Sequence, residues 1–291
     1  MVQVRVPATS ANVGCGFDTL GLALSLYTTF TFEEIDHGLI WEGCEPQFQN
    51  EDNLIYKSFQ ETLHYLNKKV TGVKITIDCN VPVSRGLGSS STCVIGGIVG
   101  AYALSETPID RNEILKLATA IEGHPDNVAP AIFGGLCVSC IVDEEPITVR
   151  YELNERFIFQ ALIPNFETLT SEARKALPVA LPFQDVIYSL SHLPLVIHAF
   201  ANYDLVMLKK VMGDKIHEPY RKKLIHEYED VKKICENIDS QAFFISGSGS
   251  TLLNVLKDKE DAFIIESELK NLKYHWESVI LSADRSGFKI L

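Results

Sequence analysis

The chain has 291 residues, 46% of them hydrophobic and 22% charged, and its formal net charge at pH 7 is −12. Such a composition is typical of a globular protein with enough core for one large domain or two of ordinary size. The acidic balance argues against nucleic acid and anionic membrane surfaces as partners, because both attract a basic face.

Cysteine usage and the first residues predict a cytoplasmic protein. The seven cysteines are odd in number and scattered along the chain, which is not a disulfide framework. The opening residues MVQVRVPATSAN do not have the pattern of a signal peptide. The uncharged run 86–105 has an apolar part too short to cross a membrane.

The chain opens with a predicted strand (2–6), a glycine-rich turn (14–21) and a second strand (23–34). The segment 7–21, which contains this turn, presents Asn12 and Asp18, an amide and a carboxylate that suit a small polar ligand with an amino group. Its glycines miss the G-x-G-x-x-G spacing of a dinucleotide site. A solvated turn in which Asp18 caps a helix is the alternative.

Residues 53–66 follow as a predicted amphipathic helix, and 73–80 alternate between apolar and polar as in a half-buried strand. This strand leads into the most informative segment, VPVSRGLGSSSTCVIGGIVGAYAL at 81–104. Gly86 and Gly88 permit close backbone approach, and three serines (89–91) precede a buried apolar helix whose N–H groups point at them. We interpret the loop as a phosphate cradle, with Ser90 as a candidate Mg²⁺ ligand and Arg85 as a nearby cation.

This cradle is not of the Walker type, because G-x-x-x-x-G-K-[ST] does not occur in the chain. The alternative is an ordinary loop in which Ser89 or Ser90 caps the helix.

The next helix, 111–121, is expected to be capped by Asp110 and to stop at Gly123-His124-Pro125. The segment EGHPDN at 122–127 brings two acids and an imidazole together. Magnesium is commonly held by one or two carboxylates plus substrate phosphates. A second carboxylate can orient or deprotonate a nucleophilic hydroxyl. The alternative is a capped turn between two helices, with Asp126 capping the second.

A charged, proline-containing stretch at 143–155 predicts a domain boundary, which divides the chain into 1–150 and 151–291. The second half reads as a strand (157–163), a helix led by Thr170, two helices within 183–210, a helix at 222–237, strands at 243–245 and 252–256, a helix at 260–271 and a strand at 276–281. The predicted class is α+β in two domains.

The loop SGSGST at 246–251 lies between two of these strands and can close over a phosphate from the second domain; its alternative is a flexible turn. Three glycine-rich, hydroxyl-lined loops so far apart in the chain favour phosphoryl transfer. Catalysis of that reaction depends mostly on positioning and charge neutralisation.

At these residues the sequence resembles the GHMP small-molecule kinases. PVSRGLGSSS at 82–91 is similar to the phosphate-loop motif of that family, and SGSGST at 246–251 to its third motif. Three segments are similar to its homoserine kinase branch: PATSANVGCGFDTLGLAL at 7–24, HPDNVAPAIFGG at 124–135 and TSEARKALP at 170–178.

The resemblance implies a two-domain α+β fold. Its N-terminal domain is like domain 2 of ribosomal protein S5, with a left-handed crossover, and its C-terminal domain is ferredoxin-like. It also implies an ATP- and Mg²⁺-dependent kinase that converts L-homoserine to O-phospho-L-homoserine for threonine biosynthesis. The family often forms homodimers, and nothing in the sequence itself shows one.

The resemblance further implies roles for individual residues. The implied Mg²⁺ ligands are Ser90 and Glu122, and Asn53 is implied on the adenine side. The implied ATP-binding residues of the cradle are Pro82, Arg85, Gly86, Leu87, Gly88, Ser89, Ser90, Ser91 and Thr92. The implied acceptor contacts are Asn12, Asp18, His124, Asp126, Arg174 and Arg221, with the two arginines on the carboxylate.

Near the transferred phosphate the resemblance implies Thr170 and Thr251, the latter in the loop with Gly247 and Gly249. Asp126, Glu122 and Thr170 are the implied catalytic residues. Two routes stay open for the hydroxyl proton, either to Asp126 or directly to the γ-phosphate. From the residues alone, Arg174 and Arg221 would be ordinary surface charges on helices. A kinase for another alcohol and a non-catalytic nucleotide-binding relative are the alternative functions.

Overall fold

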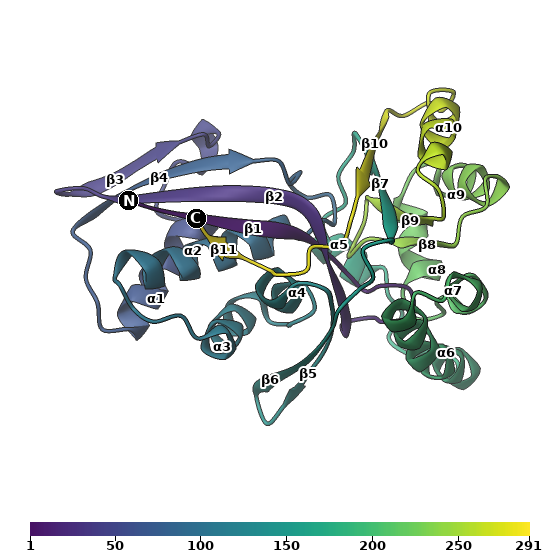
Figure 1. Ribbon diagram of the computed structural model, residues 1–291, viewed down its shortest axis with the longest axis horizontal. Helices are drawn as coiled ribbons and strands as arrows, with labels where there is room; N and C mark the ends of the chain where they lie inside the picture. The colour runs from purple at the N-terminus through teal and green to yellow at the C-terminus, as the bar shows by residue number, and fades with distance from the viewer.

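The first of two sheets in the computed structural model, which describes residues 1–291, has seven strands. Its path is β11-β1-β2-β4-β3, and β5 continues from β2 to β6. The strands are β1 (Val2–Ala11), β2 (Leu20–Glu34), β3 (Gly38–Glu42), β4 (Gly72–Cys79), β5 (Leu136–Val142), β6 (Glu145–Tyr151) and β11 (Lys289–Ile290). All pairs are antiparallel except β3–β4. The β5–β6 hairpin projects away from the rest of the molecule (Figure 1).

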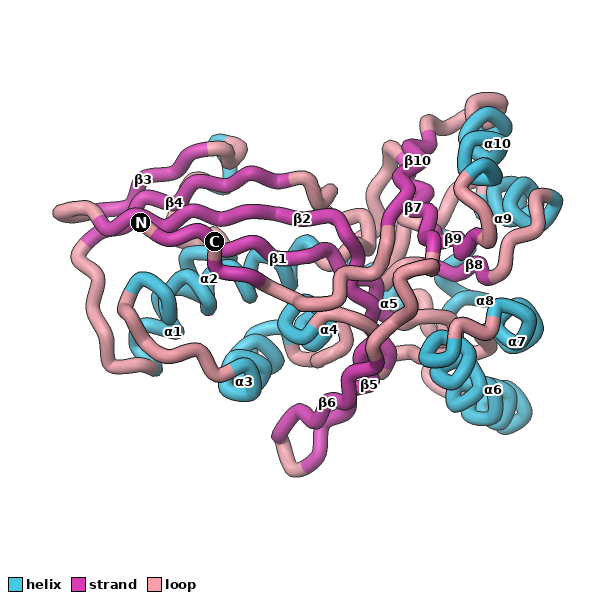
Figure 2. The backbone as a smooth tube through the Cα atoms, in the orientation of Figure 1, coloured by secondary structure: helices cyan, strands magenta, loops and turns pink.

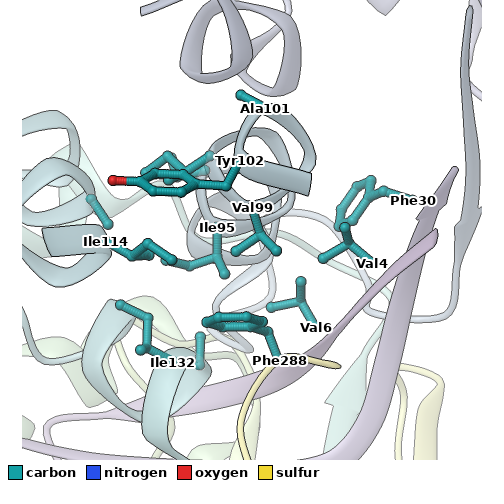
Figure 3. Close-up of a cluster of buried hydrophobic side chains, with 14 of the residues drawn as sticks. Val4, Val6, Phe30, Ile95, Val99, Ala101, Tyr102, Ile114, Ile132 and Phe288 are labelled. Carbon is teal, nitrogen blue, oxygen red and sulfur yellow. The ribbon is translucent and has the colours of Figure 1, made fainter. Parts of the chain in front are cut away.

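Helices of the first half pack on one face of this sheet (Figure 1). They are α1 (Leu54–Tyr65), α2 (Ser89–Leu104), α3 (Arg111–Glu122) and α4 (Val128–Phe133). Asn53 caps α1 by accepting a hydrogen bond from the Ile55 N–H, and Asp110 caps α3, as its sequence predicts. The uncharged α2 lies in the centre, where Ile95 and Val99 meet Val4 and Val6 of β1 (Figure 3).

The second sheet has the order β10-β7-β9-β8, and all its pairs are antiparallel. Its strands are β7 (Ile158–Pro164), β8 (Ala242–Ile245), β9 (Leu252–Leu256) and β10 (Trp276–Leu281). The helices of this half are α5 (Thr170–Lys175), α6 (Phe183–Asn202), α7 (Leu205–Val211), α8 (Glu218–Arg221), α9 (Tyr228–Asn237) and α10 (Glu260–Leu269), and short 3₁₀ turns lie at 46–48 and 222–224. Figure 2 shows the two sheets in separate lobes.

After β10 the chain returns to the first sheet. Ala283 bridges to Leu24 of β2, and β11 then pairs with β1 beside the start of the chain (Figure 1). Phe288 is 2% exposed and joins the core under the first sheet (Figure 3). The last residues therefore complete the lobe that the first residues begin.

The α+β class is confirmed, and the helices and strands expected around the site are present. Four details differ from the expectation. The charged stretch 143–155 contains β6, paired with β5; β3 and β11 were not expected; and the helix expected at 222–237 begins only at Tyr228, after α8. Finally, α2 begins at Ser89, so the three serines form its first turn and do not precede it. None of the helices combines the length and apolar character needed to span a membrane.

Candidate active site

A cleft of about 1280 Å³ lies between residues of the two lobes. Of the predicted site residues, it is lined by Asn12, Asp18, Asn53, Pro82, Arg85, Gly86, Gly88, Ser89, Ser90, Ser91, Thr92, Glu122, His124, Asp126, Thr170, Arg174, Arg221 and Gly247. Leu87, Gly249 and Thr251 do not line it. Leu87 and Thr251 are instead fully buried beneath the two glycine-rich loops.

The N-terminus of α2 opens into this cleft. Its N-cap is Gly88 in the left-handed region (φ 69°), and no side chain caps the helix, so neither Ser89 nor Ser90 plays that part. A Cβ at Gly88 would lie 2.0 Å from Thr9 Oγ1, which leaves room only for glycine. The first N–H groups and the positive dipole end of a 16-residue helix therefore face the cleft, as anion binding requires.

Glu122 ends α3 opposite this first turn. Ser90 Oγ donates a hydrogen bond of 2.5 Å to Glu122 Oε1, and Ser91 Oγ donates one of 3.3 Å to Oε2. A hydroxyl and a carboxylate are thus adjacent at the mouth of the cradle. Oxygen donors of this kind are those that Mg²⁺ prefers.

The two glycine-rich loops are joined directly. Ser246 Oγ donates to the Gly86 carbonyl at 2.6 Å, and the Thr251 N–H donates to the Arg85 carbonyl at 3.1 Å. Gly86 has φ 74°, and a Cβ there would lie 2.2 Å from the Ser246 carbonyl oxygen. The 246–251 loop of the second lobe is therefore seated against the cradle of the first.

Two predicted ATP-binding residues have structural partners. The Arg85 guanidinium lies 3.2 Å from the Glu167 carboxylate, and its Nε donates to the Pro164 carbonyl, so it ties the cradle to the second lobe. Asn53 Nδ2 donates to the Phe48 carbonyl while its oxygen caps α1. Both still line the cleft.

His124 and Asp126 form a hydrogen-bonded pair at the turn between α3 and α4. His124 Nδ1 lies 2.6 Å from Asp126 Oδ1, and Asp126 is 1% exposed. This hydrogen bond raises the pKa of His124 against the effect of burial, and the charges of Asp18 and Glu122 act in the same direction. Asp126 is therefore not the cap of α4. The N-cap residue is Asn127, which accepts a hydrogen bond from Thr9 Oγ1.

A second charged pair lines the same cleft. Both terminal nitrogens of Arg174 donate to the Asp18 carboxylate at 3.1 Å, a bidentate ion pair between α5 and the turn after β1. Asn12, with φ 59°, accepts from the Asp18 N–H and donates to the Gly247 carbonyl at 3.0 Å. The amide and carboxylate expected in this turn therefore lie together, opposite an arginine.

Arg221 is not a surface charge, since it is 2% exposed. Its Nη1 donates to the Gly247 carbonyl at 2.9 Å, and burial lowers its pKa. The guanidinium lies 5.0 Å from the centre of the Phe17 ring. No spacing in the sequence signals this burial, because the partner at Gly247 is distant along the chain.

Hydroxyl groups surround the remaining part of the site. Thr170 Oγ1 lies 3.3 Å from Ser248 Oγ, while the buried Thr251 Oγ1 has no hydrogen-bond partner. Sequence reasoning missed Thr168, Ser248 and Phe17. The first two line the cleft, and Phe17 packs against the arginines. Phe17 belongs to the predicted 14–21 turn and Ser248 to the predicted 246–251 loop, so the sequence offered a signal for these two residues but not for Thr168.

Comparisons with known proteins agree on one family. The model of the GHMP kinases N terminal domain matches residues 53–135, and that of the GHMP kinases C terminal matches 196–275. A homoserine kinase of Clostridium botulinum (strain 657 / Type Ba4) is 44% identical over 289 residues, covering 99% of this chain and 97% of that protein. A homoserine kinase of Clostridium beijerinckii is 40% identical over 294 residues, covering 100% of this chain and 99% of that protein.

Solved structures share the fold over the whole chain. The crystal structure of homoserine kinase from Cytophaga hutchinsonii has a TM-score of 0.89 at 23% identity, covering 100% of this chain and 97% of that one. The L. major mevalonate kinase in complex with R-mevalonate has a TM-score of 0.76 at 15% identity, covering 97% and 96%. Since both halves match the family models and the relatives align along nearly the full length, the chain belongs to the GHMP kinases, in their homoserine kinase family.

Proposed function

We propose that this protein transfers the γ-phosphoryl group of ATP to the side-chain hydroxyl of L-homoserine, giving O-phospho-L-homoserine and ADP in threonine biosynthesis. The observation that carries the proposal is the set of residues that line one cleft. This cleft is lined by an uncapped helix N-terminus and by an aspartate and two arginines. The homoserine kinase relatives give the acceptor its identity.

In this proposal the α2 N-terminus and the Gly86–Gly88 backbone hold the triphosphate. Ser90 and Glu122 fit a Mg²⁺ ion, because their oxygens are adjacent and face the place where helix N–H groups attract phosphate. When bound, Mg²⁺ neutralises charge on the β- and γ-phosphates. Thr170 and the 246–251 loop support the transferred group from the second lobe.

The acceptor binds as a zwitterion. Its carboxylate pairs with Arg174 and Arg221, and its amino group with Asp18 and Asn12. The side-chain hydroxyl then points to the His124–Asp126 pair. Its oxygen forms the new bond to the γ-phosphorus as the bond to the ADP oxygen breaks. The proton passes to Asp126 or directly to the γ-phosphate, and both routes stay open.

An assay that couples ADP release to added L-homoserine tests the proposal, with ³¹P NMR to identify the phosphate ester. Turnover that saturates with L-homoserine is expected, and D-homoserine and mevalonate serve as acceptor controls. Turnover no higher than the ATPase background would overturn the proposal. A preference for another alcohol would instead identify a GHMP kinase of different specificity.

A further inference from the structure

His217, a buried imidazole outside the proposed chemistry, sits under the turn that carries Asn12 and Asp18. It is fully buried, and its Nε2 lies 2.9 Å from the Gly14 carbonyl oxygen. A carbonyl can only accept, so Nε2 carries the proton and donates this hydrogen bond. Nδ1 is buried without a partner. Burial lowers the pKa of His217, and the positive charge of Arg221 lowers it further against the opposing Asp214, so the ring is neutral.

The face of the imidazole supports a second residue of the same turn. The His217 imidazole stacks on the Phe17 ring, with the ring centres 5.4 Å apart and the ring planes at 27°. Phe17 in turn lies 5.0 Å from the Arg221 guanidinium and 5.9 Å from that of Arg174. The Phe17 ring is therefore close to His217 and to both arginines of the cleft.

The position of His217 is itself fixed by Asp214. One carboxylate oxygen of Asp214 accepts hydrogen bonds from the backbone N–H groups of His217 and Glu218, at 2.6 and 2.8 Å. The Arg221 N–H donates to the His217 carbonyl at 3.0 Å, so the arginine follows the histidine in one turn of helix. The hydrogen-bonded segment 214–221 thus supports the turn after β1.

We propose that His217 is a positioning residue for the acceptor: it holds Gly14 by a hydrogen bond and Phe17 by stacking, and thereby sets Asp18 and Arg221 at the spacing of an amino acid's charges. Asn12 and Asp18 flank the two supported residues and are joined by the bond from the Asp18 N–H to Asn12. The inference rests on the proposed function, because it assumes an amino acid acceptor. It assigns His217 no contact with substrate.

Two variants of the same length separate the hydrogen bond from packing. His217→Gln keeps an amide N–H able to reach the Gly14 carbonyl, whereas His217→Met fills similar space without a donor. We expect His217→Met to raise the KM for L-homoserine about two- to tenfold more than His217→Gln does, the range of one net hydrogen bond. The KM for ATP should stay within about twofold in both, because the cradle is built from other residues.

Further variants control for general effects of substitution and test the stacking of His217 on Phe17. His198→Met, at an exposed position on α6, should leave both KM values unchanged, and thermal unfolding shows whether each variant is folded. Phe17→Leu keeps the His217 bond to Gly14 but removes the ring, and should also raise the KM for L-homoserine alone. It provides the test if the His217 variants do not fold.

The outcomes distinguish the two proposals. No wild-type turnover with L-homoserine would overturn the proposed function and this inference with it. Wild-type turnover with equal KM values in the two His217 variants, or with the KM for ATP rising in parallel, would overturn the inference alone. In that case the histidine has only a structural role.

Discussion

Two charged side chains that line the cleft, Glu122 and Arg174, have different environments, and the proposed function gives them different chemical tasks. Glu122 accepts from two serines of α2, next to the helix end where phosphate is attracted. Arg174, whose side chain is about half exposed, donates to both carboxylate oxygens of Asp18, and in the proposed function it contacts the acceptor. Substitutions at these two positions should therefore affect different kinetic constants.

We expect Glu122→Gln to lower kcat by roughly 10- to 100-fold or more. This is the usual effect of losing a residue that hydrogen-bonds to a metal ligand, and Glu122 is proposed to be a ligand itself. The amide has no charge with which to hold Mg²⁺ beside Ser90. The measurement is kcat as a function of Mg²⁺ concentration, which should show a raised requirement for the metal. Glu113→Gln, at the other end of α3, is the matched control. An unchanged kcat at ordinary Mg²⁺ would contradict this role.

Arg174→Ala should mainly raise the KM for L-homoserine, by about 10- to 100-fold, as loss of a charged hydrogen-bonding partner predicts. Arg174→Lys should recover part of the effect, because lysine keeps the charge but not the planar fork. Steady-state kinetics at varied homoserine and saturating ATP measures both. If Arg174→Ala and Glu122→Gln caused equal, large losses of kcat, the assignment of separate tasks would be wrong.

Segments with strong local signals were predicted well, and those defined by distant partners were not. The capping residues Asn53 and Asp110 indicate the starts of α1 and α3, and the uncharged composition of α2 indicates a buried helix. The strand β6 alternates apolar and polar residues, but its turn is made by Asp143 and Glu144 at positive φ, and two acidic residues resemble a linker.

Residues of the site also differ in how far the sequence predicts them. The loops and their polar residues were identified, whereas the burial of Arg221 depends on Gly247 and Phe17 and has no local signal.

The contact between the two glycine-rich loops depends on the absence of a side chain at Gly86. We expect Gly86→Ala to destabilise the protein by about 1–3 kcal/mol, because alanine is strained at φ 74° and its Cβ would meet the Ser246 carbonyl. The KM for ATP should rise at the same time. Urea unfolding and ATP kinetics test both expectations. An alanine variant with wild-type stability and KM would show that the loops can separate without consequence.

The short α8 carries a carboxyl group that makes stability depend on pH. Desolvation raises the pKa of Glu218 from 4.5 to about 8, although it accepts a hydrogen bond from the Ile245 N–H. The folded state therefore keeps a proton that the unfolded state has lost. This contribution to stability is complete below pH 4.5 and is lost as the pH rises to about 8.

Glu218→Gln stays neutral and should gain stability relative to the wild type as the pH is raised from about 5 to 8. Urea unfolding of both proteins at several pH values gives the difference in unfolding free energy. A difference that does not change with pH would contradict a raised pKa for this carboxyl group.

At the scale of the whole molecule, two chain segments connect the lobes. One follows β6, and the other follows β10, where Ala283 bridges to Leu24 and β11 reaches β1. Arg111 of α3 holds the returning segment through the Ser286 and Phe288 carbonyl groups, each at 3.1 Å. Both connections thus reach the second sheet at two neighbouring strands, β7 and β10.

Phe288→Ala should lower the unfolding free energy by about 3–5 kcal/mol, the usual cost of removing a buried phenylalanine ring. The Phe288 ring fills the core between β1, α2 and α4 (Figure 3). The guanidinium carbon of Arg111 also lies over this ring, 4.3 Å from its centre. Ile290→Ala is a suitable control, because Ile290 is 43% exposed. Chemical denaturation measures both, and a cost under about 1 kcal/mol for Phe288→Ala would contradict this role.

The return of the chain to its first sheet has a consequence for synthesis on the ribosome. The hydrophobic core of the first lobe needs Phe288, whereas every strand and helix of the second lobe lies between residues 158 and 281. A nascent chain therefore has all the elements of its second lobe before it has all those of its first. We expect the N-terminal half to remain incompletely packed, and accessible to chaperones, until the segment that contains Phe288 has been synthesised.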